Sequence, residues 1–241
     1  MTPYYADDHA TLYHGNWRDF QDEWAGTHVD LLLTDPPYGR NWRQGGLKGA
    51  RRPGGSPRQV DDTRAGIAGD KDAAERDQAL TAWEMATDRR AIVFGDLMLP
   101  PPRRSKLTAV YAKPADAGAR GAIGGLRRDA EAIYLIGPWT SRIGGRTSIF
   151  RTTASQVGGA SGIVAQAGGH PHAKPLDVLA ALLGLAPDAN TIADPFTGSG
   201  SILVAAKLAG RQAVGVEIEE RYCEIAARRL AQDVLNFGDA S

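Results

Sequence analysis

Short apolar runs alternate with segments of helical periodicity over most of the chain. The apolar runs are of strand length and predict β-strands at residues 29–34, 91–94, 107–112, 132–136, 191–193 and 213–216. Helical spacing predicts helices at residues 73–88, 176–185, 201–209 and 219–235. This alternation is typical of an α/β fold with a mostly parallel sheet. The 241 residues suffice for one sizeable core, so we expect a single domain over residues 1–241.

Two segments lack this pattern. Residues 39–68 are rich in glycine, proline and arginine, and residues 137–169 are polar and rich in glycine, serine and threonine. Loops as long as the first are usually functional or disordered in a compact domain. We therefore expect residues 39–68 to serve a function rather than to build the core.

Basic residues are clustered although the chain is formally neutral, with 28 Lys and Arg against 28 Asp and Glu. Residues 40–58 hold six Lys or Arg and no acid, and residues 137–176 hold four and no acid. Such asymmetry is what a polyanion-binding face produces on an otherwise neutral protein. Solvated loops with a chance excess of charge are the alternative.

The single cysteine and the absence of long apolar runs exclude several classes. Cys223 alone allows no intramolecular disulfide and no cysteine-based zinc site. No apolar run is long enough to span a bilayer, and the first residues lack the pattern of a signal peptide. We therefore expect a cytoplasmic protein with no membrane partner.

A glycine-rich motif, Asp-Pro-Phe-Thr-Gly-Ser-Gly at residues 194–200, lies between a predicted strand and a predicted helix. Its glycines allow a tight turn and close approach to a ligand. Glu217 follows Gly198 by 19 residues, at the end of the next predicted strand, where a carboxylate accepts ribose hydroxyls. The third glycine of the dinucleotide fingerprint is missing, which favours a nucleoside cofactor without a pyrophosphate. A strand-turn-helix with incidental glycines is the alternative.

A second motif, Asp35-Pro36-Pro37-Tyr38, ends an apolar strand. The two prolines stiffen the loop and donate no backbone N–H, so the loop presents acceptors, namely the Asp35 carboxylate and the Pro36 carbonyl. An aromatic ring follows. Two acceptors beside a ring suit an amino group on a flat heterocycle, although a chance turn of this composition is the alternative.

Together the two motifs resemble those of the DNA amino-methyltransferases, which make N6-methyladenine or N4-methylcytosine. The catalytic motif precedes the cofactor motif here, as in the permuted beta group of that family. Four shorter segments are also similar to the group's pattern: His14-Gly15-Asn16, Tyr111-Ala112-Lys113, Arg127-Arg128-Asp129-Ala130-Glu131 and His170-Pro171-His172-Ala173-Lys174-Pro175. Asn16 stands where the group often has an acid, which puts its contact to the cofactor adenine in doubt.

The resemblance implies a doubly wound, mostly parallel, seven-stranded methyltransferase sheet that is Rossmann-like. Its two motifs would meet at the carboxyl ends of adjacent central strands. The implied cofactor is S-adenosyl-L-methionine, with no metal. The residues implied to bind it are Asp194, Pro195, Phe196, Gly198, Gly200, Glu217 and Lys174. Lys174 would meet the methionine carboxylate; a surface lysine at a helix start is the alternative.

The implied partner is double-stranded DNA, with the target base flipped out of the stack. Asp35, Pro36, Pro37 and Tyr38 form the implied catalytic loop, in which Asp35 and the Pro36 carbonyl hold the amine and Tyr38 stacks on the base. Residues 39–68 would be a basic DNA-binding loop, and residues 137–169 a short target-recognition insertion. Its shortness implies recognition of few base pairs or help from a second subunit in a homodimer.

For four other candidate residues, a structural interpretation stands beside a functional one. His170 and His172 have metal-ligand spacing but no third ligand, so structural or DNA-contacting roles are favoured. Trp42 is either a stacking residue or a partly buried loop residue. Cys223, far from both motifs, is expected to pack rather than to act as a nucleophile toward cytosine C5.

The motif beginning with Asp35 favours adenine N6 over cytosine N4, as the resemblance implies, within DNA methylation of the restriction-modification kind. Three rival functions stay open. They are an RNA base methyltransferase, a non-catalytic DNA-binding protein, and an enzyme acting on a protein glutamine amide.

Overall fold

A mixed β-sheet forms the centre of the molecule. The computed structural model describes residues 2–39, 70, 72–86, 88–117, 124–141, 144–156, 162–168 and 172–232. Residues 40–68 of the predicted basic loop 39–68, which include Trp42, and also His170 lie outside this part of the chain. The strands in the described ranges are β1 (Tyr5–Ala6), β2 (Ala10–His14), β3 (Leu31–Thr34), β4 (Arg90–Gly95), β5 (Ser105–Ala112), β6 (Ala130–Ile136), β7 (Ile149–Arg151), β8 (Thr191–Asp194) and β9 (Gln212–Glu217).

The strands join in the order β1-β2-β9-β8-β3-β4-β6-β5-β7. From β2 to β4 all neighbours are parallel, and β6 runs antiparallel to both β4 and β5. The seven strands from β2 to β5 confirm the predicted methyltransferase sheet. The edge strands β1 and β7 were not predicted, because each is too short to leave an apolar pattern, and β2 was not predicted either.

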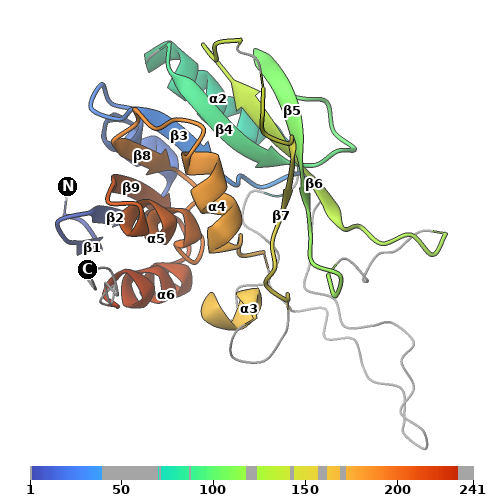
Figure 1. Ribbon diagram of the computed structural model, residues 1–241. Coiled ribbons are helices and arrows are strands. Elements are labelled where there is room, and N and C mark those ends of the chain that lie inside the picture. The colour runs from blue at the N-terminus through green and yellow to red at the C-terminus, as the bar shows by residue number, and fades with distance from the viewer. Residues whose placement is uncertain are drawn as a thin grey trace, which may run out of the picture.

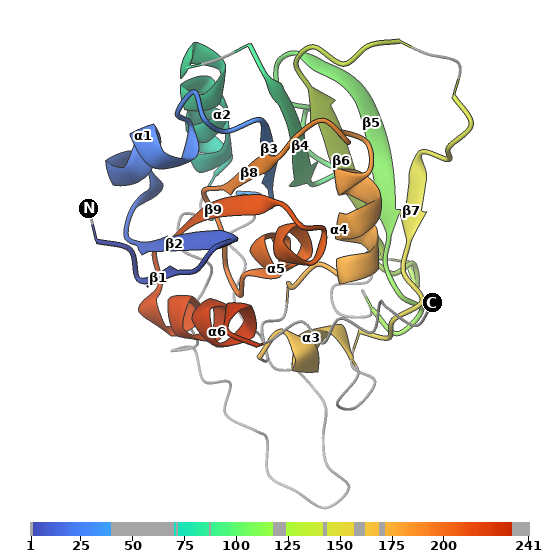
Figure 2. The same cartoon turned by 60° about the vertical axis from the view of Figure 1, so that its left-hand side comes forward.

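Helices cover both faces of the sheet (Figure 1). They are η1 (Trp17–Phe20), α1 (Gln21–Trp24), α2 (Ala74–Ala86), α3 (Ile163–Gln166), α4 (Leu176–Leu183), α5 (Ser201–Leu208) and α6 (Glu220–Leu230). Figure 2 shows α4, α5 and α6 on one side of the sheet and α1 and α2 on the other. None of the helices in the described ranges is long and apolar enough to cross a membrane.

Alternation along the central strands supplies two cores, because successive side chains of a strand point to opposite faces. Leu31 and Leu33 of β3 pack in the cluster with α4, α5 and α6, whereas Leu32 packs in the cluster with Trp24 and Trp83. A strand buried on both sides reads as a continuous apolar run. This is why β3, β4, β8 and β9 were predicted correctly.

The segment expected to be a target-recognition insertion, residues 137–169, takes part in the fold. It contributes β7, which pairs in parallel with β5, and the short helix α3. Phe150 of β7 packs against the core. At least this part of the segment therefore builds the edge of the sheet.

A buried hydrogen bond joins the two central strands that carry the motifs. The Thr34 hydroxyl, at the end of β3, donates to Asp194 Oδ1, at the end of β8, at 2.7 Å. The Phe196 amide donates to the same oxygen at 3.1 Å. Asp194 Oδ2 has no hydrogen-bond partner in the described part of the chain, and burial raises the pKa of Asp194 to about 7.

We expect Asp194 to make the folded state less stable as the pH rises from about 4 to about 7. The unfolded chain releases this proton near pH 3.9, whereas the folded chain holds it up to its raised pKa, so the unfolded state binds fewer protons in this window. The predicted slope is about 1.4 kcal/mol per pH unit for one proton. Asp194→Asn, which mimics the protonated acid, should remove this part of the pH dependence.

Urea unfolding at pH 5 and pH 8 measures the effect as a difference between wild type and variant. The exposed Asp22→Asn is the matched control and should keep the wild-type dependence. Equal pH dependence in Asp194→Asn and wild type would show that Asp194 is already ionised at pH 5.

Candidate active site

The two sequence motifs meet where the central parallel strands of the sheet end. β3 and β8 are parallel neighbours, so the Asp35 loop and the 194–200 loop leave the sheet side by side. Parallel strands place ligands outside their carboxyl ends. The predicted meeting of the motifs at adjacent central strands is confirmed.

The 194–200 loop is fixed by its own backbone. The Thr197 hydroxyl donates to the Asp194 carbonyl at 2.9 Å, and the Thr197 amide donates to the Val216 carbonyl at 3.0 Å. Gly200 has a φ of +81°, and a Cβ there would lie 2.9 Å from the Ala226 Cβ on α6. A side chain at this turn would be strained and would push α6 away, so glycine is required.

Glu217, at the end of β9, faces this loop. Its Oε2 accepts the Gly198 amide at 2.7 Å and its Oε1 accepts the Glu219 amide at 2.8 Å. Burial raises the pKa of Glu217. A carboxylate oxygen has about two lone-pair sites, so each oxygen can still accept a hydroxyl.

An aromatic pair adjoins the 194–200 loop on the face of the sheet that α1 and α2 cover. The half-buried Phe196 ring lies 6.3 Å from the Trp17 ring, centroid to centroid. The Trp17 indole donates to Glu75 at 2.9 Å. Asn16 accepts the Arg18 amide at 3.0 Å and so caps η1, which gives this residue a structural role at the position where an acid was expected.

The Asp35 carboxylate is held from two sides. The Tyr38 hydroxyl donates to Oδ1 at 2.6 Å, and the Lys174 ammonium donates to Oδ2. Burial and the nearby carboxylates of Asp35 and Glu131 raise the pKa of Tyr38 well above its usual value, so the hydroxyl stays a donor. Pro36 and Pro37, in the same loop, are buried.

Lys174 is buried, with only 6% of its side chain exposed, so the surface alternative is wrong. Its ammonium also lies 3.3 Å from Glu131 Oε2, and Glu131 Oε1 lies 2.6 Å from the Lys113 ammonium. Burial opposes charge on both partners. Lys174 and Lys113 nevertheless lower the pKa of Glu131 to about 2, and Asp35 and Glu131 raise the pKa of Lys174.

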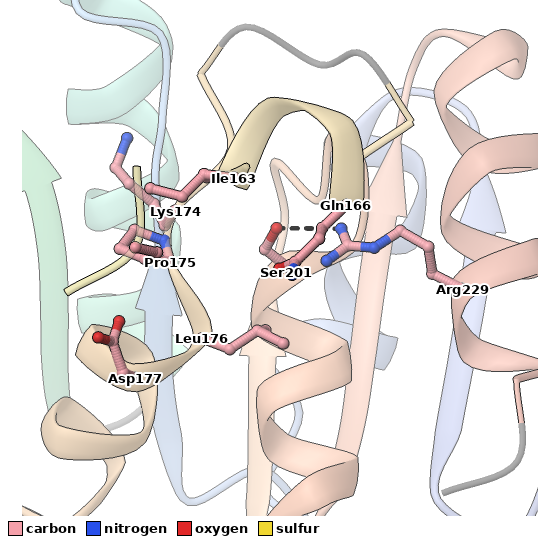
Figure 3. Close-up of a pocket in the computed structure, with 9 residues that line it drawn as sticks. Ile163, Gln166, Lys174, Pro175, Leu176, Asp177, Ser201 and Arg229 are labelled. Atoms are coloured by element: carbon pink, nitrogen blue, oxygen red, sulfur yellow. Dashed lines mark hydrogen bonds between the residues drawn. The ribbon is translucent and has the colours of Figure 1, made fainter. Parts of the chain in front are cut away.

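A pocket of about 240 Å³ lies between α3, the segment that leads into α4, the start of α5, and α6. Figure 3 shows Arg229 reaching Ser201 from α6, with Lys174 and Pro175 on the opposite side. Arg229 donates to the Ser199 carbonyl at 2.6 Å and to the Ser201 hydroxyl at 3.0 Å. Burial lowers its pKa to about 10.

His172 and Cys223 border the site. Burial and the charge of Lys174 lower the pKa of the half-buried His172. Cys223 is buried on α6, as expected, but its Sγ lies 3.5 Å from the Glu217 carbonyl, so the expectation that it is far from any motif is wrong. Burial raises the pKa of this thiol to about 12. No three potential metal ligands cluster within the described ranges.

Sequence reasoning assigned no role to three residues at this edge. Thr34, Glu131 and Arg229 are polar groups within or beside buried elements. The signal for Glu131 was available, since a charged residue interrupts the otherwise apolar strand β6. A buried charge requires a partner, but the sequence does not say which lysine supplies it.

Comparison with known proteins gives a consistent picture. Residues 139–228 match the model of a family described as DNA methylase, N6_N4_Mtase. The type II methyltransferases M2.DpnII of Streptococcus pneumoniae and M2.LlaDCHI of Lactococcus lactis subsp. cremoris are each 42% identical to this chain over 65 residues. Each match covers 27% of this chain and 24% of the relative, so it spans about a quarter of these relatives' length.

Solved structures share the fold over nearly the whole chain. The M1.HpyAVI–SAM complex superposes with a TM-score of 0.60 at 16% identity, covering 92% of this chain and 100% of that one. The cytosine-N4-specific PvuII DNA methyltransferase gives a TM-score of 0.61 at 14% identity, covering 96% and 89%. The class I methyltransferase fold is shared with both. The part of the chain at residues 139–228 is thus similar to N6/N4 DNA methylases, and nearly the whole chain shares its fold with these two solved structures.

Proposed function

We propose that this protein is an S-adenosylmethionine-dependent DNA methyltransferase that methylates an exocyclic amine of a base. One observation carries the proposal. The acceptor loop at Asp35 and the glycine loop at residues 194–200 leave neighbouring strands and are joined by the Thr34–Asp194 hydrogen bond. A group bound on one loop is therefore within reach of a group bound on the other.

The residues around the glycine loop fit this cofactor. Glu217 offers two carboxylate oxygens to ribose hydroxyls, and the Phe196 ring offers an apolar face to adenine. Asp194 Oδ2 is a buried polar atom without a partner in the described part of the chain, which suits a ligand that brings a polar group to this loop. One of the solved structures with the same fold is a complex with SAM.

When bound, this cofactor supplies an electrophilic methyl group on a sulfonium. The amine of a nucleobase is a poor nucleophile because its lone pair is delocalised into the ring. In the proposed mechanism, hydrogen bonds from the amine to Asp35 and to the Pro36 carbonyl favour its pyramidal form and stabilise the positive charge that grows on nitrogen. Positioning of this kind can contribute about 7–11 kcal/mol.

We propose double-stranded DNA as the substrate, with the target base flipped and stacked on Tyr38. The lack of a large recognition domain in the described ranges is compatible with a short target or with a homodimer. Adenine N6 is the proposed position, since Asp35 begins the motif as it does in most adenine enzymes of the resembling group. Cytosine N4 is the second candidate, because the cytosine-N4-specific PvuII enzyme shares the fold.

Digesting the treated DNA to nucleosides and identifying the methylated species by mass tests the reaction. Wild type should form N6-methyladenine in unmethylated duplex DNA. Asp35→Ala should form none above background, because it removes the principal acceptor for the amine, while cofactor affinity stays within about threefold, since Asp35 is assigned to the base. Finding N4-methylcytosine as the sole product would change the assigned base from adenine to cytosine. Finding 5-methylcytosine as the sole product would refute the reaction class. Activity on RNA alone would refute the substrate.

Glu217→Gln should weaken cofactor binding measured by titration calorimetry without DNA. Loss of a charge-assisted acceptor costs about 1.5–3 kcal/mol, which corresponds to a roughly 10- to 150-fold higher Kd. Glu219→Gln is the matched control, because Glu219 is two residues away and pairs with Arg221. Equal affinities for the two variants would place the ribose elsewhere.

Tyr38→Phe and Tyr38→Ala separate the ring from the hydroxyl. Stacking on an aromatic side chain contributes about 1–3 kcal/mol per base, so Tyr38→Ala should raise the KM for DNA roughly 5- to 150-fold. Tyr38→Phe keeps the ring and loses only the hydroxyl bonded to Asp35, so its KM should stay near wild type. An equally high KM in both variants would assign the role to the hydroxyl instead.

A further inference from the structure

Four buried or half-buried charges of alternating sign form a chain that ends at the proposed catalytic carboxylate. Lys113 follows β5, Glu131 lies on β6, Lys174 precedes α4 and Asp35 follows β3. The chain is neutral as a whole. It brings together four segments. Lys113 and Glu131 end two of the segments that are similar to the methyltransferase group's pattern, but that similarity assigns neither residue a role.

We propose that Glu131 is a positioning residue that holds Lys174 against Asp35, and that Lys113 fixes Glu131 for this task. The inference rests on the proposed function, in which Asp35 receives the target amine. It gives Lys174 the Asp35 carboxylate as its partner, whereas the sequence resemblance gave it the methionine carboxylate of the cofactor.

The surroundings leave the Lys174 ammonium little freedom. Two carboxylates flank it, and it lies 4.9 Å from the centre of the Phe94 ring and 5.8 Å from that of Tyr38. With Oδ2 tied to this fixed cation and Oδ1 tied to Tyr38, the Asp35 carboxylate cannot rotate freely. The remaining lone pairs therefore point in fixed directions when a base arrives.

Glu131 also weakens the electrostatic effect of the Lys174 ammonium on the Asp35 carboxylate. A cation shared by two carboxylates neutralises each of them only in part. Without Glu131 the full charge of Lys174 would act on Asp35 and would compete with the amine that becomes positive during the reaction. Loss of Glu131 should thus slow the chemical step more than it weakens cofactor binding.

Glu131→Gln and the double variant Lys113→Met/Glu131→Gln distinguish positioning from simple stabilisation. The single variant leaves Lys113 without its carboxylate, whereas the double variant removes a matched pair of charges. If Glu131 positions Lys174, single-turnover methyl transfer should fall about tenfold or more in both variants, while the cofactor Kd stays within about threefold. The Tm should fall in the single variant and return toward wild type in the double variant.

Recovery of the methyl-transfer rate together with the Tm in the double variant would overturn the proposal, because Glu131 would then only balance Lys113. A single variant with wild-type rate would overturn it as well.

A titration followed by NMR of protein labelled with ¹³C at lysine Cε tests the arrangement without any methyl transfer. Asp35, Glu131, His172 and Tyr38 face Lys174, and Lys113 lies on the other side of Glu131. Removing one of its two carboxylates should lower the pKa of Lys174 in Glu131→Gln, with Lys174→Met assigning the signal. An unchanged Lys174 pKa would overturn the proposal even if wild type is active. An inactive wild type with the expected shift would refute the proposed function and leave the charge chain standing.

Discussion

The hydrogen bond from Thr34 to Asp194 connects the two halves of the site. It joins residues 160 positions apart in the sequence, at the carboxyl ends of β3 and β8. Because Asp194 Oδ1 also accepts the Phe196 amide, the same oxygen sets the direction in which the glycine loop leaves the sheet. The Asp35 loop begins one residue after Thr34. A shift at this contact would therefore change the distance between the Asp35 loop and the 194–200 loop.

The central strands and both motifs could be predicted from the sequence, because each depends on local pattern. β3, β8 and β9 are apolar runs, and the special geometry of Gly200 leaves a glycine in the sequence. The edge strands β1 and β7 carry too little buried surface to leave a pattern. The charge chain was not predictable for another reason. Its members lie on four segments, and their pairing depends on how the ends of β3 and β5, the strand β6 and the segment before α4 meet.

The charge chain contributes little to the stability of the core. Taking ions out of water costs several kcal/mol each, and a buried ion pair often stabilises a fold no better than well-packed apolar residues would. Glu131 and Lys174 are among the most buried charges of the described residues. Stability alone therefore explains their presence poorly, whereas a need for fixed charges beside Asp35 explains it well.

The same charges constrain how a base enters. In this structure both Asp35 oxygens already accept one donor, Tyr38 on one side and Lys174 on the other. Lys174 is buried and forms ion pairs with both Asp35 and Glu131, whereas Tyr38 is only half-buried. The hydroxyl of Tyr38 is thus the donor more easily displaced from Asp35. A base that stacks on the Tyr38 ring would therefore compete with the hydroxyl for Oδ1, while Lys174 keeps the carboxylate oriented through Oδ2, so recognition of the base is coupled to activation of its nitrogen.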